Sequence, residues 1–190
     1  TPDNATGKRL TLTEALNRAI ALEPNFAQAH ALLAHTWISR DTIGAGGRST
    51  IGQFGQRTSP SFTPIQSQID RTLALEPNLA EAHSAQGRLN WHRWKFDEAE
   101  RELRLAIALN ASDATAHYSL GRVLLCVGRI DEADAALQRA AELDPLAHRI
   151  LDNRAMPLRF AGRFAESLAF DERALALQPD AAQPNWQKAV

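Results

Sequence analysis

Six histidines, one cysteine and 22 acidic residues are the side chains of this 190-residue chain that could bind a metal or take part in catalysis. Their spacing favours neither role. His30 and His35 are five residues apart, so they diverge on a helix, and no cysteine lies near them to complete a metal site. No nucleophile, base and orienting group occur in a usable combination. The sequence therefore predicts no catalytic site, no metal centre and no cofactor, and we expect that the chain is not an enzyme.

A glycine-rich segment partly matches a phosphate-binding loop. It reads Gly-Gly-Arg-Ser-Thr at 46–50, but Thr42 occupies the place of the early glycine, Arg48 replaces the usual lysine, and no strand precedes it. We therefore predict a flexible loop here. Nucleotide binding, or contact with a partner or a sensed molecule, is the alternative.

The elements that must position these side chains recur with a fixed period. Alanine-rich segments end with Leu-Glu-Pro at 75–77, Asn-Ala at 110–111, Leu-Asp-Pro at 143–145 and Leu-Gln-Pro at 177–179, in steps of 34 residues. An earlier Leu-Glu-Pro at 22–24 precedes this series by one period plus an insertion. A 34-residue period is typical of helix pairs, each of which buries its apolar face by stacking on a neighbour. No strand pattern competes, so the fold class is all-α.

The period also divides the chain. We expect a linker or frayed end at 1–8 and a single domain at 9–190. Its expected parts are a half unit at 9–24, a unit at 27–77 with an insertion at 41–60, units at 80–111, 114–145 and 148–179, and a terminal helix at 182–190. Because the chain starts with a half unit and with Thr1 in place of methionine, we expect a piece of a longer protein.

The best-preserved unit alternates large and small residues in a recognisable order. The residues are His117, Leu120, Gly121, Leu124, Gly128, Ala133, Leu137, Ala140 and Pro145. This pattern resembles the tetratricopeptide repeat (TPR), and the resemblance covers about residues 9–190. It implies an α-solenoid, that is, a right-handed superhelix of antiparallel helix pairs. Independently, Gly121, Ala133 and Ala140 are small enough to let two helices approach closely.

In the tetratricopeptide family the first helix of each unit lines the concave face, where peptides commonly lie. Carrying these positions over gives the candidate peptide-binding residues His35, Arg88, Trp91, Tyr118, Arg122, Leu125, Arg149, Asp152, Met156 and Arg159. Arginines beside aromatic rings suit a protein or peptide that is acidic and partly apolar. The resemblance thus implies a protein-protein interaction scaffold. The alternative is an ordinary solvated face, with binding on another surface or none.

One stretch, Trp-His-Arg-Trp-Lys-Phe at 91–96, mixes aromatic with basic side chains, a combination that can stack on single-stranded nucleic acid. Phe96, however, occupies a usual packing position of the repeat, and Trp94 replaces the turn glycine. We therefore predict packing in the core and at the turn, and no direct binding of nucleic acid.

Arg154 and Asp171 interrupt the apolar pattern of one unit. Each stands where the unit before has a leucine, Leu120 or Leu137. In a helix pair that turns near Gly162 these two positions should face each other, so we predict an ion pair between them. The alternative is that Arg154 extends to solvent and that Asp171 is simply exposed.

Composition limits the compartment and the partners. A net charge of −1 creates no global field that would favour nucleic acid or an anionic membrane. No apolar run approaches the roughly 20 residues of a membrane-spanning helix, and no signal peptide is visible. The single cysteine, Cys126, excludes an intrachain disulfide and fits a reducing compartment. We therefore expect a cytoplasmic protein that does not bind membranes.

The residue sequence within the repeats shows a second resemblance. Ala-Ile-Ala-Leu-Glu-Pro-Asn at 19–25, Ala-Gln-Ala-His at 27–30 and Asp-Glu-Ala-Glu at 97–100 look like the C-terminal repeat arrays of bacterial multidomain regulators. In those proteins a DNA-binding or signalling domain precedes the repeats. The resemblance implies an alternative function, namely a regulatory, sensory or self-association module of a larger transcriptional regulator or signalling enzyme. Such a module would act either by self-association, as a homo-oligomer, or by sensing a small ligand through the insertion at 41–60.

Overall fold

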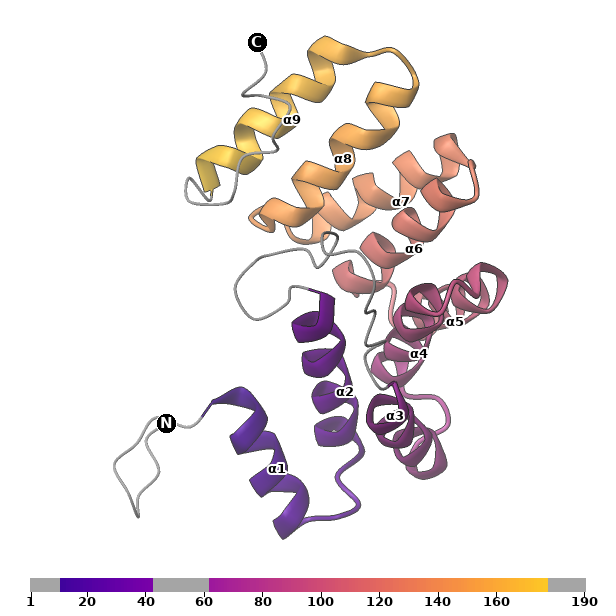
Figure 1. The fold of residues 1–190 in the computed structure, drawn as a ribbon, viewed down its shortest axis with the longest axis vertical. Helices are drawn as coiled ribbons and strands as arrows, with labels where there is room; N and C mark the ends of the chain where they lie inside the picture. Colours follow the sequence, from indigo (N-terminus) through magenta and orange to yellow (C-terminus); the bar gives the residue numbers. More distant parts are fainter. Residues whose placement is uncertain (1–10, 43–61, 178–190) are drawn as a thin grey trace, which may run out of the picture.

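The structure is a computed structural model that describes residues 11–42 and 62–177, and within these ranges it contains helices and no strands. The helices are α1 (Leu12–Leu22), α2 (Ala27–Thr42), α3 (Thr63–Leu75), α4 (Ala80–His92), α5 (Phe96–Leu109), α6 (Ala114–Cys126), α7 (Ile130–Leu143), α8 (His148–Phe160) and α9 (Phe164–Leu177). Figure 1 shows them rising in one stack, from α1 at one end to α8 and α9 at the other. None of these helices is both long and apolar enough to cross a membrane. The expected all-α solenoid is confirmed. The expected linker and terminal helix, and nearly all of the expected insertion, lie outside the described ranges.

The helix ends follow from local sequence. Thr11 starts α1 with a capping box, because its hydroxyl accepts from the Glu14 N–H at 3.3 Å and its own N–H donates to the Glu14 carboxylate at 2.8 Å. The carboxylate of Asp113 accepts from the backbone N–H groups of Thr115 and Ala116, at 2.8 and 3.1 Å, and so caps α6. A proline follows the C-cap of α1, α3 and α7 and cannot continue a helix.

The turn inside each of the last three helix pairs holds one residue in the left-handed region. This residue is Gly128 (φ 78°) or Gly162 (φ 73°) in two pairs, and Trp94 (φ 63°) between α4 and α5. Glycine adopts this conformation without strain, whereas a Cβ disfavours it. Trp94 is 74% exposed and touches the ring of Phe96 edge to face. Trp94 therefore takes the place of the turn glycine, as predicted, but it does not enter the core, whereas Phe96 does pack against the core.

In the pairs α4/α5 and α6/α7 the two helices approach closely because glycine lies at their crossing. A Cβ built on Gly87 would lie 2.6 Å from Cγ of Leu103, and one built on Gly121 would lie 2.6 Å from Cγ of Leu137. Both leucines are fully buried, as is Ala140 on α7. The interior is therefore filled by leucines that occupy the space above glycine.

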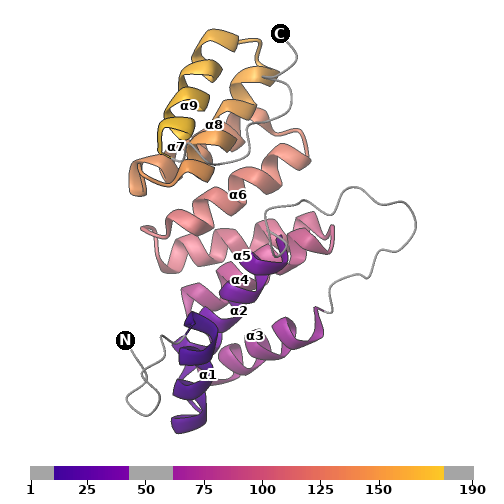
Figure 2. The same cartoon turned by 60° about the vertical axis from the view of Figure 1, so that its left-hand side comes forward.

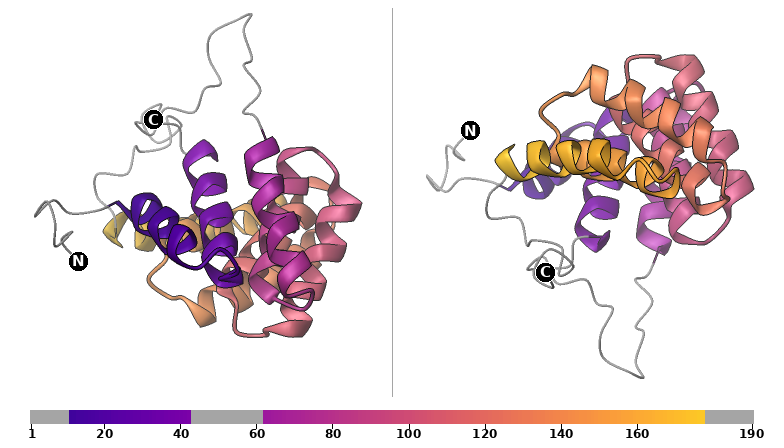
Figure 3. Two further views of the ribbon diagram at one scale, coloured as in Figure 1. Left: turned by 90° about the horizontal axis from the view of Figure 1, so that it is seen from below. Right: turned by 90° about the horizontal axis from the view of Figure 1, so that it is seen from above.

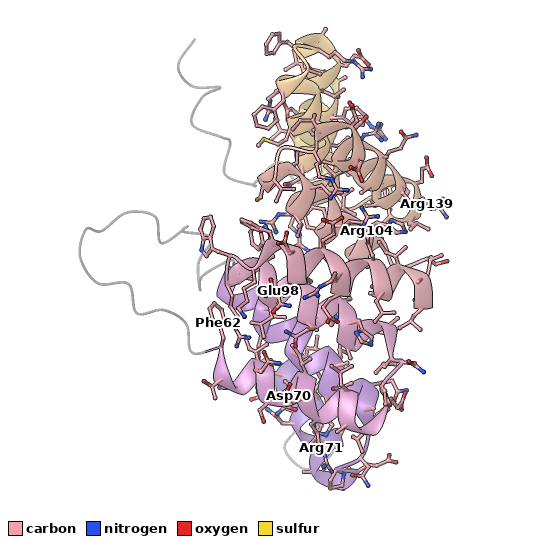
Figure 4. The ribbon with its side chains drawn as sticks, turned by 90° about the vertical axis from the view of Figure 1, so that its right-hand side faces the viewer. Phe62, Asp70, Arg71, Glu98, Arg104 and Arg139 are labelled. Carbon is pink, nitrogen blue, oxygen red and sulfur yellow. The ribbon has the colours of Figure 1, made fainter. Side chains whose placement is uncertain are left out.

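The first helix of each pair lies on the concave side of the stack. α2 contacts α4, α4 contacts α6 and α6 contacts α8, whereas the second helices of the described pairs, α3, α5, α7 and α9, do not contact one another. The first helices therefore converge and the second helices spread apart. Figure 2 shows the layered pairs from a second side, and Figure 3, which looks along the stack, shows successive pairs turned about its axis. We call the surface formed by α2, α4, α6 and α8 the inner face. Figure 4 shows the outer face, with Asp70 and Arg71 on α3, Glu98 and Arg104 on α5 and Arg139 on α7.

Candidate binding surface on the inner helices

The residues expected to bind a peptide all lie on first helices, and so on the inner side of the stack. His35 is on α2, Arg88 and Trp91 on α4, Tyr118, Arg122 and Leu125 on α6, and Arg149, Asp152, Met156 and Arg159 on α8. These four helices contact one another in order, so the candidates from successive pairs lie on neighbouring helices. Asp152 is placed only as part of α8, since its side chain is outside the described part of the structure.

Arg88 is held by two hydrogen bonds to α2. Its Nη1 donates to Nδ1 of His35 at 2.6 Å, and its Nη2 donates to Oγ of Ser39 at 2.9 Å. Nε2 of His35 lies 2.8 Å from the carbonyl oxygen of Glu81, which can only accept. The ring proton of His35 is therefore on Nε2, and Nδ1 accepts from Arg88. With both ring nitrogens engaged, His35 positions Arg88 and does not reach toward a ligand.

Positive charge accumulates around Arg88. Burial, together with the charges of Arg149 and Arg122, lowers the pKa of Arg88 to about 10. Burial and the charge of Arg88 lower the pKa of His35 to about 4, so its imidazole is neutral near pH 7. Burial and the charges of Arg122 and Arg88 likewise lower the pKa of His92 to about 4. Within the described ranges, none of the three arginines forms an ion pair with a carboxylate.

Arg122 lies over two aromatic rings. Its guanidinium carbon is 3.9 Å from the ring centroid of Trp91 and 5.6 Å from that of Tyr118. Such cation–π contacts fix the plane of the guanidinium and leave its edges open to other groups. The Tyr118 hydroxyl accepts from Nδ2 of Asn153 on α8 at 3.2 Å. Nε1 of Trp91 is buried without a hydrogen-bond partner among the described residues, and Leu125 packs against the core.

Of the candidates on α8, only some interact with the residues around Arg88 and Arg122. Arg149 is exposed and acts on Arg88 through its charge. Met156 is 37% exposed, and Nη1 of Arg159 contacts its sulfur at 3.7 Å. Nη2 of Arg159 bonds to the carboxylate of Asp171 on α9. Arg159 is therefore drawn toward its own partner helix, and the charge of its guanidinium is already balanced.

The predicted ion pair between Arg154 and Asp171 is wrong. Nε of Arg154 lies 3.3 Å from the carboxylate of Asp134 on α7, and Asp171 pairs with Arg159 instead. Leu120, which takes the place of Arg154 one repeat earlier, belongs to a core cluster that includes residues of α5. This position therefore faces the preceding helix pair and not the partner helix within its own pair.

Sequence reasoning missed three polar residues of the inner face. Ser39 follows His35 by one helical turn, so its presence on the same side of α2 could have been inferred. Asp113 could have been recognised as an N-cap by its position before Ala114. The bond from Asn153 to Tyr118 joins two helix pairs and left no local signal, because it depends on how the pairs stack.

Comparisons with known proteins agree with this architecture. The sequence profile of the tetratricopeptide repeat matches residues 114–147. MamA is 21% identical, with 90% of each chain covered and a TM-score of 0.59. TTC0263, a thermophilic TPR protein of Thermus thermophilus, is 20% identical, with 89% of this chain and 82% of that chain covered and a TM-score of 0.64. YrrB, described as a TPR protein with an unusual peptide-binding site, is 18% identical, with 94% and 84% covered and a TM-score of 0.59. A comparison with curated proteins gave no match. Residues 114–147 thus match a tetratricopeptide repeat, and the described stack has the fold of the tetratricopeptide-repeat proteins to which it is similar.

Proposed function

We propose that this chain is a protein-interaction scaffold that holds a segment of another protein on its inner face, and that the segment is acidic and partly apolar. The observation that carries the proposal is a set of three arginines, Arg88, Arg122 and Arg149, none of which forms an ion pair with a carboxylate of the described residues. The rings of Trp91 and Tyr118 lie beside them. Guanidinium groups bind carboxylates through paired hydrogen bonds, and arginine, tyrosine and tryptophan contribute most to binding at interfaces.

The role is one of binding and not of catalysis. The likeness in fold to YrrB, described as having a peptide-binding site, supports a peptide or protein partner. We propose the cytoplasm as the compartment, because Cys126 is an exposed free thiol and a reducing compartment keeps it so. With a net charge of −1 we propose no nucleic acid or membrane as a partner.

The test is a pull-down from a lysate of the source organism with the parent chain and two charge-reversal variants. Arg88→Glu, Arg122→Glu changes the inner face, and Arg101→Glu, Arg139→Glu makes the same change in charge on exposed arginines of α5 and α7. We expect a protein that the parent and the outer variant retain and that the inner variant loses. Peptide arrays should show that this protein binds through an acidic segment. Equal retention by all three folded chains would place the site elsewhere and contradict the proposal.

A second candidate function, self-association within a larger regulator, is favoured by the apolar end of the stack. Phe160, Phe164 and Leu168 are 65%, 69% and 47% exposed. Phe164 has the repeat position of Phe96, which the next helix pair helps to bury in the core. Contiguous exposed apolar side chains mark interaction sites. Sedimentation velocity should then show a dimer, and Phe164→Asp should dissociate it. The control Leu22→Asp changes a residue of α1 that is 82% exposed and should leave the dimer intact. A monomeric parent would exclude this function.

A further inference from the structure

We propose that two copies of this chain associate through the outer side of α5, packed antiparallel about a two-fold axis that passes between positions 99 and 100. In this dimer Trp94 of one copy faces Leu105 of the other, and Glu98 faces Arg101. Figure 4 shows the side in question, with Glu98 and Arg104 labelled on α5. The interface lies away from the inner face, so it does not depend on what the inner face binds.

Two apolar residues on the outside of α5 are exceptions to the repeat. Leu105 is 43% exposed, and its counterparts in the other second helices are all arginine. Allowing for the insertion, these counterparts are Arg18, Arg71, Arg139 and Arg173. Trp94, at the other end of α5, replaces the glycine of the next two turns and is largely exposed with a positive φ. Such a strained residue is found mainly at functional sites, so both exceptions indicate a contact surface.

The side chains between these two residues are complementary to themselves. Asp97 and Glu98 follow Trp94, and Arg101 precedes Leu105 by about one turn. Along α5 the order is therefore apolar, acidic, basic, apolar. Two antiparallel copies bring each acid opposite a base and each apolar end opposite the other, whereas parallel copies would bring like charges together. The pattern thus favours a second copy of this chain as the partner.

The charges that the second copy would meet are available. Among the described residues Asp97 and Arg101 form no ion pair, and Glu98 has one at the long distance of 4.0 Å. On the same helix Glu100 and Arg104 are already joined at 2.8 Å. Five charged side chains line an open depression on the outer side of α5, namely those of Asp97, Glu98, Glu100, Arg101 and Arg104. The second copy would enter this depression at the two-fold axis.

The dimensions of the contact set its strength. Trp94 and Leu105 are about 16 Å apart along the helix, at 1.5 Å per residue. Two-fold symmetry provides each contact twice, which gives two Trp–Leu contacts and two ion pairs between Glu98 and Arg101. A contact of this length is at the small end of specific interfaces, so we expect a reversible dimer with a dissociation constant in the micromolar range.

The test is sedimentation velocity of the parent, Glu98→Arg and Arg101→Glu over a series of protein concentrations. The parent should form dimers, and each variant alone should dimerise at least tenfold more weakly, because like charges then face each other twice. Mixed in equal amounts, the two variants should associate with each other, since every acid again faces a base. A parent that is monomeric at all concentrations, or a mixture no more dimeric than its components, would overturn the proposal.

Two further variants restore the residues that the repeat has elsewhere. Leu105→Arg introduces the arginine of the other second helices, and Trp94→Gly introduces the glycine of the next two turns. Both should fold, as verified by circular dichroism, and both should weaken dimerisation at least tenfold. Arg139→Glu, at an exposed residue of α7, is the matched control for Arg101→Glu and should leave the dimer unchanged. Unchanged dimerisation in Leu105→Arg would overturn the proposal.

These outcomes are distinct from those of the functions proposed above. Phe164→Asp should leave the α5 dimer intact. A dimer that Phe164→Asp dissociates and Arg101→Glu does not would reject the α5 interface and support the apolar end of the stack. The outer variant of the pull-down contains Arg101→Glu, so it should be monomeric and still retain the partner on its unchanged inner face. Failure of the pull-down would therefore reject the scaffold function and leave the α5 interface standing.

Discussion

Replacing Gly121 with alanine adds a methyl group where α6 and α7 approach most closely. The new Cβ would lie 2.6 Å from Cγ and 2.9 Å from Cδ2 of Leu137, and 3.2 Å from the carbonyl oxygen of Ala133. Carbon atoms in favourable contact are about 3.5–4.0 Å apart. Leu137 is fully buried, so either it leaves its rotamer or the two helices separate.

Two opposing terms set the size of the effect. Alanine is favoured over glycine in a helix interior by about 0.8–1.0 kcal/mol. Overpacking a buried site costs about 1–3 kcal/mol. The difference predicts that Gly121→Ala lowers the free energy of unfolding by about 1 kcal/mol. Ala135→Gly, at an exposed site of α7, measures the propensity term alone and should cost about 1 kcal/mol.

Other helix pairs of the same chain indicate how the clash is relieved. At the repeat positions of Gly121 and Leu137, one pair has Ala155 with Asp171, and the first has Ala34 with Ile69, which share one core cluster. Neither pair combines alanine with leucine. Replacing leucine by isoleucine moves a methyl group from Cγ to Cβ, so Leu137→Ile should accommodate the new methyl.

The assay is urea unfolding followed by circular dichroism for the parent, Gly121→Ala, Leu137→Ile and the double variant. Leu137→Ile alone should lose less than about 1.5 kcal/mol. The double variant should lose about 1 kcal/mol less than the sum of the single losses, since contacting residues couple. Additive losses, or a Gly121→Ala protein more stable than the parent, would refute the packing argument.

Three further predictions concern the core, an ion pair and pH. Ala140→Leu should overpack a fully buried site and cost about 1–3 kcal/mol, and an unchanged Tm would contradict the repeat register. Arg159→Leu should cost about 1–3 kcal/mol in urea unfolding, because it leaves the buried carboxylate of Asp171 without its cation, and a neutral result would mean that solvent replaces the cation. The pKa values of His35 and His92 are about 4 in the folded chain, below the ordinary 6.5. Between pH 4 and about 6.5 the unfolded chain therefore binds more protons than the folded chain. The free energy of unfolding should consequently fall as the pH drops from about 6.5 to 4. His35 should account for about 1–3 kcal/mol of that loss. The urea midpoints measured at pH 7, 5.5 and 4.5 should therefore decline less steeply in His35→Gln than in the parent. Equal declines would exclude His35 as a cause.

The fold was predictable because its determinants are local and repeated. Small residues at the helix crossings and prolines after the helices recur at one interval, and each acts within its own pair. The candidate site was predictable only as a set of positions on first helices. That Arg88 bonds to His35 and Ser39 depends on the distance between α2 and α4, which no local pattern contains. Arg154 was assigned the wrong partner for the same reason, because its neighbours belong to the preceding pair.

The charge pattern of the inner face nevertheless has a trace in the sequence. At the start of the second helices, Lys95, Arg129 and Arg163 recur at the repeat interval, and each is followed three residues later by a glutamate with which it pairs. Arg88 and Arg122 also share one repeat position, but the residues three and four places before and after them include no acid. Positions within one turn are those that can pair on a helix. The repeat thus supplies a counter-charge at one basic position and none at the other. Arginine without an acid within one turn of its own helix, in two successive units and on the first helices, is what an anion-binding surface requires. Binding at that surface should therefore weaken steeply as ionic strength rises, because added salt screens these charges.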